Sequence, residues 1–551
     1  MAEPAAWLLM LALVAIFVIL SLKLRDAAGP FHIWHTLDAS YYYLFDALNL
    51  AEGFPPGHIP HPGLPADLLA ALVLKAKGLG AEAVLADPED ALRLLSNGAV
   101  ALVGGSLFLA MLAAWLWVRR LSAVILMGIA PLVSMVALKM LWHVKPEPVV
   151  FAAALLACLP LLRSFRHPGT LERASTAVVL GLLGAVMVTA KWSALPLLVI
   201  PFLCLRGWRP KLWFVVSGML GGGLLLAPAW GELDWVFGYL WSLIIHADAH
   251  GGGAETVADW AAYPGTVIKI LRRPILLLPV VLGLLFACWG TLRRVRGGEV
   301  DRTAIRLAFA GGSGLLIMAL AVAKQPVAYY LVPAFVFSVF TLVAVCRVVA
   351  SFGWGGDGLR RTVGAFLVLA LLGLAGAQVG AANRQAEEYS RHRDEALLVE
   401  DGRFAACRRL FLYGASSPDF ALLLGSYLTG NHFADRVAER IGPDRYWADD
   451  YYPFDEDKGR DARGPVALAE VLAAKPCLVI SGFAWRDGWR TVVQPALAGR
   501  EPTATCSWPM QRAVTYGIDC EGRLVGDSVQ SGGTGNERPQ ADDPGKAGPG
   551  L

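Results

Sequence analysis

Charged residues are scarce in this chain. Only 17% of its 551 residues are Asp, Glu, Lys or Arg, against about 25% in an ordinary soluble domain. The hydrophobic fraction is 56% and the mean hydropathy is +0.51. No basic patch is interleaved with aromatic residues, so nothing indicates a nucleic-acid partner. The shortage of charge argues against a string of soluble domains. Apolar stretches of about 20 residues, enough to cross a hydrocarbon core, recur instead and predict a mainly α, polytopic membrane protein.

The apolar stretches predict about eleven membrane-spanning helices. The first of them lacks the basic n-region of a cleaved signal peptide, which favours a helix that stays on the chain. The expected spans are 7–24, 91–118, 122–141, 148–162, 175–190, 194–206, 212–230, 274–292, 304–323, 331–347 and 362–382.

Lys and Arg gather in alternate loops. They cluster at 163–173, 206–211 and 293–306, whereas the opposite loops hold fewer once the long first loop, about 25–90, is set aside. By the positive-inside rule the richer loops are cytoplasmic, although Lys23 and Arg25 taken alone argue for the reverse. We therefore expect a multi-pass protein of the bacterial inner (plasma) membrane, with a cytoplasmic N-terminus and a periplasmic or extracellular C-terminal part.

After residue 382 the composition becomes that of a soluble domain. "RRLFLYGAS" predicts a strand, "SPDFALLLGSYLTG" a helix, and "LAEVLAAKPCLVISG" a helix followed by a strand. This alternation predicts a membrane domain over 1–382 and a small α/β domain over 383–525, outside the membrane. The Gly-, Pro- and charge-rich tail, 526–551, is expected to be disordered.

Four cysteines belong to the expected α/β domain. They are Cys407, Cys477, Cys506 and Cys520. Four cysteines permit three pairings, which the sequence does not distinguish. Disulfides persist only in an oxidising compartment, so pairing would agree with an outer location. Four unpaired thiols remain the alternative.

Polar residues from distant turns are expected to collect on the outer face. A charge at the bilayer centre costs at least roughly 2.5–3.5 kcal/mol, so polar groups next to spans are informative. Lysine would bind the phosphate of a lipid-linked substrate, a carboxylate would accept a proton from an acceptor hydroxyl, and aromatic rings would face a sugar. A merely polar outer loop remains the alternative for each residue alone. The candidates are Asp38, Tyr42, Asp46, His61, Glu147, Lys191, His246, His250, Lys324 and Tyr330.

Several of these turns resemble motifs of one enzyme superfamily. Asp38 is followed by Tyr42, Gly53 and then "HPG" from His61, which resembles the acid-led first outer loop of the GT-C superfamily. The likeness is to the branch with protein O-mannosyltransferases and the lipid A aminoarabinose transferase (glycosyltransferase family 39-like). "TAKWSALPLL", with Lys191, resembles that branch's "TK" turn. "KQPVAYYLVPA" resembles its late turn, with Tyr330 and Pro333 matching.

The resemblance implies a glycosyltransferase that moves a sugar from a polyprenyl-phosphate donor to a lipid, glycan or protein acceptor at the outer face, with inversion. It makes Asp38 the candidate catalytic base or acceptor-orienting acid, and Lys191 and Lys324 candidate ligands of the donor phosphate. Glu147 matches a place where the family often has a polar or acidic residue. Membrane lipids are the other expected partners.

The sequence also departs from the family pattern. The second acid of the motif is replaced by Ala39, and Asp46 would supply it if 38–50 is helical, since residues four apart share a helix face. Tyr329 stands where the family often has Arg. The alternating His246, Asp248 and His250 leave a divalent metal, a substrate contact or a plain polar loop open; no other cofactor is expected.

Two other functions remain open. One is a transporter or flippase of lipid-linked sugars, although we find no inverted repeat of the kind that transporters often contain. The other is a non-catalytic scaffold of the same fold, which the loss of the acid at Ala39 keeps possible. The sugar, the acceptor, the lipid carrier and the oligomeric state are not indicated by the sequence.

Overall fold

The structure is a computed structural model of the whole chain. It describes residues 2–33, 40–58, 63–246, 254–352, 356–400, 404–448, 458–473, 476–483, 497, 501–507 and 511–525. The chain forms two compact units. The first takes its described residues from Met1–Asp26, Asp46–Gly80 and Asp90–Glu387, and the second from Ala27–Phe45, Ala81–Glu89 and Glu388–Leu551.

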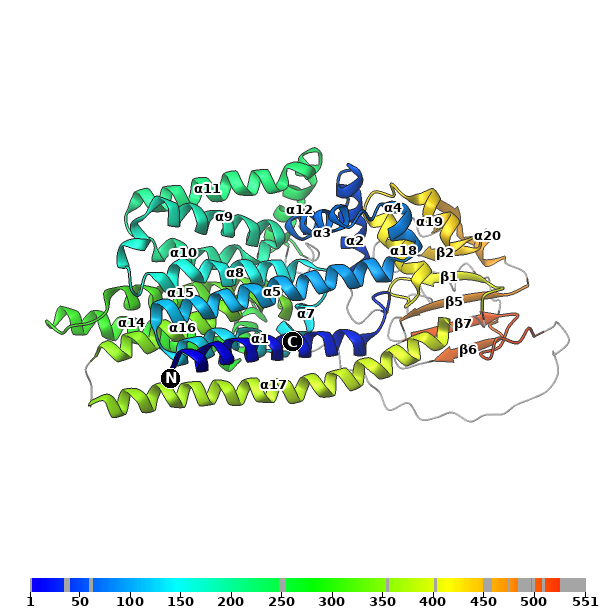
Figure 1. Cartoon of the computed structure of the whole chain (residues 1–551). Helices are drawn as coiled ribbons and strands as arrows, with labels where there is room; N and C mark the ends of the chain where they lie inside the picture. The colour runs from blue at the N-terminus through cyan, green and yellow to red at the C-terminus, as the bar shows by residue number, and fades with distance from the viewer. Residues whose placement is uncertain are drawn as a thin grey trace. The chain divides into compact units, whose positions relative to one another are not determined.

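Helices dominate the first unit (Figure 1). In chain order the α-helices of the whole chain are α1 (Ala2–Ala28), α2 (Ser40–Glu52), α3 (Leu64–Ala76), α4 (Ala81–Ala86), α5 (Pro88–Val118), α6 (Leu121–Gly128), α7 (Met135–Met140), α8 (Pro146–Arg163), α9 (Ala174–Ala190), α10 (Val199–Cys204), α11 (Trp208–Leu226), α12 (Leu233–Ile245), α13 (Tyr263–Leu271), α14 (Pro274–Val295), α15 (Arg302–Lys324), α16 (Val332–Ser351), α17 (Gly356–Glu400), α18 (Pro418–Leu428), α19 (Ala434–Ile441) and α20 (Leu468–Leu472). Short 3-10 helices are η1 (Ala130–Leu132), η2 (Pro168–Glu172), η3 (Trp192–Leu198), η4 (Ala227–Glu232) and η6 (Ala328–Leu331).

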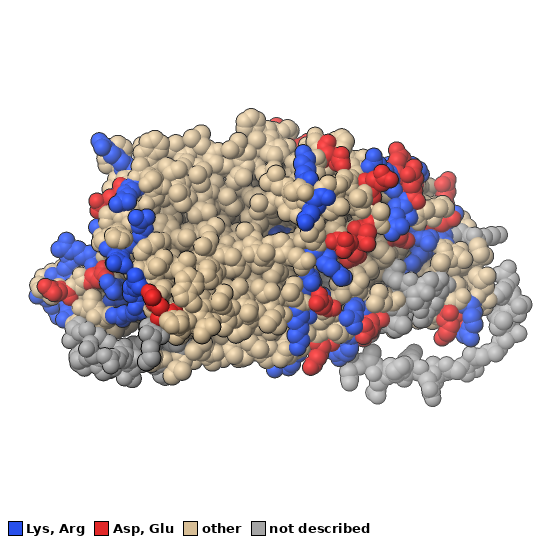
Figure 2. Space-filling model, viewed as in Figure 1, with Lys and Arg blue, Asp and Glu red and all other residues tan. Residues whose placement is uncertain are grey.

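Seven helical runs in the described residues are long and apolar enough to cross a membrane, judged by length and composition. The chain is therefore a multi-pass membrane protein. Figure 2 shows that the flank of the helical unit is almost free of charged side chains, as a surface facing hydrocarbon requires. The runs are Glu3–Ala28, Pro88–Val118, Pro146–Arg163, Trp208–Ile245, Pro274–Val295, Arg302–Lys324 and Ala328–Ser351.

The predicted count of eleven spans is not confirmed. The single span expected over 122–141 is wrong, because α6 ends at Gly128 and α7 begins only at Met135, with η1 between them. Pro131 lies inside that break, and the Ser134 side chain accepts a hydrogen bond from the N–H of Val136 to start the new helix. Ala174–Ala190 and Trp192–Cys204 are apolar but shorter than the seven runs.

Small residues let the helices of the first unit approach closely. On α9, a Cβ added to Gly181 would lie 2.1 Å from the Ser217 hydroxyl oxygen and 2.4 Å from the Phe214 carbonyl oxygen, both on α11. The two helices lie side by side along their length (Figure 1). Membrane helices usually pack by close backbone approach at Gly, Ala and Ser. Lipid tails are as apolar as the helix side chains, so the hydrophobic effect does not drive the helices together and packing contacts have to.

The second unit contains a seven-stranded sheet of order β4-β3-β2-β1-β5-β7-β6. Central β1 pairs in parallel with β2 and β5, with Leu410 opposite Tyr446 on one side and Ile480 on the other. The strand-helix pattern predicted from "RRLFLYGAS" to "PCLVISG" is confirmed, and so is the small α/β layer. The strands are β1 (Arg408–Leu412), β2 (Arg445–Ala448), β3 (Lys458–Arg460), β4 (Pro465–Ala467), β5 (Leu478–Phe483), β6 (Ala504–Ser507) and β7 (Gln511–Tyr516).

Two disulfides close this unit, Cys407–Cys477 and Cys506–Cys520. They select one of the three pairings that the sequence left open, and they exclude four free thiols. Both bridges lie in one buried cluster with Phe404 and Val479. The predicted domain boundary at residue 383 stays a prediction, since α17 runs through it without a break as far as Glu400.

Candidate functional site

Three turns that the sequence analysis selected meet in the first unit. Pro146 starts α8 and so puts Glu147 into its first turn. Helix α9 ends at Ala190 because Lys191 adopts an extended backbone, with φ −158° and ψ 114°. The third turn is η6, which carries Tyr329 and Tyr330 just before Pro333. The chain therefore presents each functional side chain at a helix end.

Lys191 is the centre of this group. Its ammonium forms an ion pair with the Glu147 carboxylate, and the two side chains are only 15% and 4% exposed. The same Nζ lies 4.2 Å from the ring centroid of Tyr329 and 5.2 Å from that of Tyr330. The two rings meet edge to face, with centroids 5.0 Å apart. A lysine over aromatic faces is stabilised by their quadrupoles.

The group has unused hydrogen-bonding capacity. Glu147 pairs with Lys191 through one oxygen, whereas the other, Oε2, is buried and accepts no hydrogen bond from the described residues. An ammonium carries three donors, so Lys191 also keeps donors beyond the one used by Glu147. A buried, half-satisfied carboxylate costs free energy and is typical of a place where a ligand supplies the missing donor.

Lys324 lies at a different helix end. Its ammonium donates to the carbonyl of Ile244 in the last turn of α12, where a cation also interacts favourably with the helix dipole. His246 follows that turn and its N–H bonds the carbonyl of Ser242 at 3.0 Å. Lys324 therefore holds the end of α12, and its predicted contact with a phosphate stays a prediction.

Asp46 belongs to a second buried group. It is 1% exposed, and Asp67 on α3 is 3% exposed. Burial raises the pKa of Asp46 to about 7, although hydrogen bonds from Gly57 and His58 oppose the rise. Burial and then the neighbouring Asp46 charge hold the pKa of Asp67 well above its usual value. Burial and mutual charge repulsion therefore disfavour a state in which both carboxyls are ionised.

Asp46 also fixes the loop that follows its helix. Its carboxylate accepts the backbone N–H of Gly57 at 2.8 Å and that of His58 at 3.2 Å. Gly53, with φ +90°, makes the turn that leads α2 into this loop. The observed bonds of Asp46 therefore serve the loop backbone, and its predicted role as a second catalytic acid stays a prediction.

Asp67 was not selected from the sequence. The available signal is an acid inside an otherwise apolar helix, "LPADLLAALVLKA". Helix α3 packs against α8, α9 and α11, and its first residue, Leu64, clusters with Trp192, Ala229 and Val236. Trp192 follows Lys191 directly. The helix that carries Asp67 thus begins beside the turn that carries Lys191.

Glu89 organises the start of the first outer loop within the second unit. Its carboxylate accepts the backbone N–H groups of Phe31 at 2.7 Å and His32 at 3.0 Å, and the hydroxyl of Tyr41 at 2.9 Å. Burial, reinforced by the Glu89 charge, raises the pKa of Tyr41 well above its usual value, so this hydroxyl stays a donor. Glu89 therefore ties the residues before and after the segment that contains Asp38.

The remaining candidates divide into described and undescribed residues. The condition that 38–50 is helical is met from Ser40 onward, and α2 places the buried Tyr42 one turn before Asp46. Asp38, His61 and His250 lie outside the described residues, as does Asp248 of the possible metal motif. Within the part of the chain that the structure describes, no group of three His, Cys, Asp or Glu side chains is placed to hold a metal ion.

No family model and no curated protein matches this chain. Among solved structures, the chain is similar to the crystal structure of ArnT from Cupriavidus metallidurans bound to undecaprenyl phosphate. The likeness covers 93% of this chain and 98% of that one, with a TM-score of 0.48 and 13% identity. A likeness of this degree does not identify a reaction, so the chemistry has to come from the chain's own residues.

Proposed function

We propose that this protein is an integral membrane glycosyltransferase that transfers a sugar from a polyprenyl-phosphate carrier to an acceptor hydroxyl at the outer face of the membrane. The observation that carries the proposal is the meeting of Glu147, Lys191 and Tyr330. These residues are far apart in sequence and belong to turns that resemble GT-C motifs.

Each residue of this group matches a part of the donor. The Lys191 ammonium has donors left for an anionic phosphate oxygen, which forms strong charge-assisted hydrogen bonds with it. The free Oε2 of Glu147 accepts a hydrogen bond from a sugar hydroxyl. The rings of Tyr329 and Tyr330 offer apolar faces to a sugar ring. Lys324, His61, His246 and His250 are proposed as further substrate contacts, with Tyr42 supporting the first loop.

The proposed reaction is a direct displacement. The acceptor oxygen attacks the anomeric carbon while the bond from that carbon to the phosphate oxygen breaks. The hydroxyl proton passes to the Asp38 carboxylate, and polyprenyl phosphate leaves with its charge held by Lys191. A positioned base of this kind contributes typically 10²–10⁴-fold to rate. We assign Asp46 to the support of the loop that follows α2.

Two independent features support an outer location for the proposed active site and the C-terminal unit. The basic loops at 163–173, 206–211 and 293–306 favour a cytoplasmic side opposite to the turns with Lys191 and Lys324. The two disulfides of the C-terminal unit agree with an oxidising compartment. We propose that this unit faces the periplasm or the cell exterior and contributes to acceptor recognition.

A transfer assay tests the proposal. The purified protein is reconstituted with a polyprenyl-phosphate sugar carrying a radiolabelled sugar and with an extract of cell-envelope acceptors. Label should move to the acceptor in the wild type and in the control Glu82→Gln, an exposed acid of the same predicted loop. The variant Asp38→Asn should lose at least about 100-fold in rate.

Two outcomes would contradict the proposal. If Asp38→Asn keeps the wild-type rate, Asp38 is not the base. If the intact labelled lipid crosses the bilayer with its sugar still attached, the protein is a transporter.

A further inference from the structure

A pocket at the other end of the helical unit has no place in the proposed reaction. Its volume is about 1,090 Å³, and it is lined by the link between α10 and α11, the second half of α14 and the start of α15. The pocket reaches Arg302, the first residue of α15, whereas Lys324 is the last. A rise of 1.5 Å per residue separates these two by about 33 Å, the thickness of a hydrocarbon core. The pocket therefore lies on the opposite membrane side from the candidate active site.

The lining of this pocket is strongly basic. None of its lining residues is acidic, and five are cations: Arg206, Lys211, Arg294, Arg302 and Arg306. Asp301 lies next to it, but its carboxylate already caps α15 at the N–H groups of Thr303 and Ala304 and pairs with Arg347 at 3.1 Å. The pocket thus holds an excess of positive charge that calls for an anion.

Two of its arginines are held in place by the protein. Arg206 donates to the Thr303 hydroxyl at 3.2 Å and lies 3.4 Å from Glu172, while its Nε is buried and unpartnered among the described residues. Arg306 donates to the carbonyl of Leu205 at 3.4 Å. In the described part of the chain, Arg294 and Arg302 form no ion pair. Guanidinium groups fixed in this way are well suited to phosphate oxygens.

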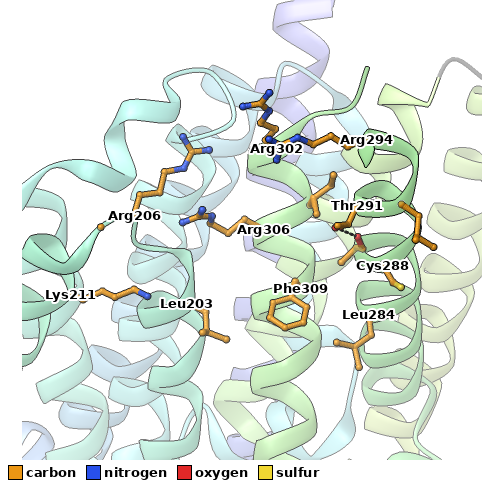
Figure 3. A pocket seen from close by; sticks show the side chains of 14 residues that line it. Leu203, Arg206, Lys211, Leu284, Cys288, Thr291, Arg294, Arg302, Arg306 and Phe309 are labelled. Carbon is orange, nitrogen blue, oxygen red and sulfur yellow. Dashed lines mark hydrogen bonds between the residues drawn. The ribbon is translucent and has the colours of Figure 1, made fainter. Parts of the chain in front are cut away.

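The pocket changes from basic to apolar along its length. Figure 3 shows Arg206, Arg302, Arg294 and Arg306 toward one end, and Leu203, Phe309, Leu284 and Cys288 toward the other, where Lys211 is the one labelled cation. The apolar part is open to the flank of the helical unit, where Phe309 is 49% exposed. Further along that flank α14 presents exposed apolar side chains, Val281, Leu285 and Trp289. A soluble anion would gain nothing from this apolar extension, whereas a lipid would.

We propose that this pocket binds an anionic phospholipid of the cytoplasmic leaflet, with the phosphate among Arg206, Arg302 and Arg306 and an acyl chain along the flank of α14. Basic pockets between membrane helices on the cytoplasmic side recognise acidic headgroups in this way. The lipid would join α11 to the hairpin of α14 and α15, and would therefore stabilise the folded protein.

Lipid binding to the purified full-length protein tests this proposal. Phosphatidylglycerol and phosphatidylcholine are titrated separately, and retained lipid is counted by native mass spectrometry alongside the thermal midpoint. The wild type should bind phosphatidylglycerol at least about tenfold more tightly. Both lipids carry the phosphate, but the choline cation of phosphatidylcholine is repelled by the five cationic side chains of the pocket, whereas the glycerol headgroup adds no positive charge. Phosphatidylglycerol should also raise the thermal midpoint.

Matched variants separate the pocket from general surface charge. Arg206→Gln/Arg306→Gln should lose most of the preference for phosphatidylglycerol. Arg294→Gln/Arg302→Gln changes exposed residues. It therefore tests the same pocket if the Arg206→Gln/Arg306→Gln variant fails to fold. The control Arg209→Gln/Arg296→Gln removes the same charge from the same loops outside the pocket and should keep the preference.

Several outcomes would overturn the proposal. Equal binding of the two lipids would show that the pocket selects no anionic headgroup. The same conclusion would follow if the control and both pocket variants lost the preference for phosphatidylglycerol equally. Displacement of phosphatidylglycerol by glycerol 3-phosphate at similar concentration would show a site for a soluble phosphate. Tighter binding of polyprenyl phosphate than of phosphatidylglycerol would make it a carrier site instead.

Discussion

The ammonium of Lys191 pairs with the carboxylate of Glu147 although the residues are 44 positions apart in the chain. Both side chains are largely buried, and removing one partner of such a pair leaves an uncompensated charge that costs about 3–5 kcal/mol. The ion pair therefore connects α8 and the end of α9, and it holds the lysine ammonium where we expect the donor phosphate.

A double-mutant cycle measures this connection. Glu147→Gln and Lys191→Met should each strongly lower the free energy of unfolding. The double variant should lose less free energy of unfolding than the two single variants added together, by about 0.5–3 kcal/mol. Unfolding by denaturing detergent provides the free energies. Strictly additive losses would show that the two groups do not interact in solution.

Among variants that still fold, Lys191→Arg should raise the KM for the donor because a guanidinium does not reproduce the contacts of an ammonium.

Glu89 is expected to act on the reaction without touching substrate. It ties Phe31 and His32 to Tyr41 across the segment that carries Asp38. Glu89→Gln keeps the shape but removes the charge and one acceptor oxygen, so kcat should fall by about tenfold or more while the donor KM changes little. Glu82→Gln serves as the control. A Glu89→Gln protein with normal kcat would show that this tie does not position the first loop.

The buried carboxyls should make stability depend on pH. Burial raises the pKa of Asp46 to about 7 in the folded protein, above the value of about 4 expected in the unfolded chain. Between these values the folded state binds more protons, so the stabilisation is complete at low pH and is lost as the pH rises through 7. The stability of the wild type relative to Asp46→Asn should therefore fall between pH 5 and pH 8. Parallel curves would contradict a raised pKa.

The close contact of α9 and α11 can be tested with glycine variants. A Cβ at Gly181 would lie within 2.4 Å of a backbone oxygen of α11, so Gly181→Ala has to separate the helices. We expect a loss of about 1–3 kcal/mol. Gly98→Ala on α5 is the matched control, because a Cβ there meets nothing within 4 Å. This variant should raise the free energy of unfolding by about 0.5–1 kcal/mol, since alanine favours a helix over glycine. Equal effects of the two variants would argue against this packing.

The disulfides provide a test of orientation. In intact spheroplasts, a membrane-impermeant reductant followed by an impermeant maleimide should modify the half-buried Cys520, and should modify the buried Cys407, Cys477 and Cys506 less. Without the reductant these four residues should stay unmodified, because they are bridged. Mass spectrometry of the labelled peptides distinguishes them from the four cysteines of the helical unit. Modification only after lysis would place the C-terminal unit in the cytoplasm.

Much of the architecture follows from local pattern. Hydropathy was sufficient for the long spans such as 274–292 and 304–323, which correspond to α14 and α15. Alternation of short elements was sufficient for β1, α18 and β5. Hydropathy failed over 122–141, where a mainly apolar run contains a helix break at Pro131 and a new helix start at Ser134. Hydropathy measures the mean of a window and is insensitive to such a break.

The site required the tertiary structure. The sequence identified Glu147, Lys191 and Tyr330 as separate candidates, but only the packing of α8, α9 and η6 brings them together. Asp67 and Glu89 went unnoticed because their importance comes from burial and from partners distant along the chain. The same holds for the basic pocket, whose arginines come from the link between α10 and α11, the end of α14 and the start of α15. Residue type and hydropathy are local properties, whereas pairing, burial and charge excess depend on distances that only the folded chain defines.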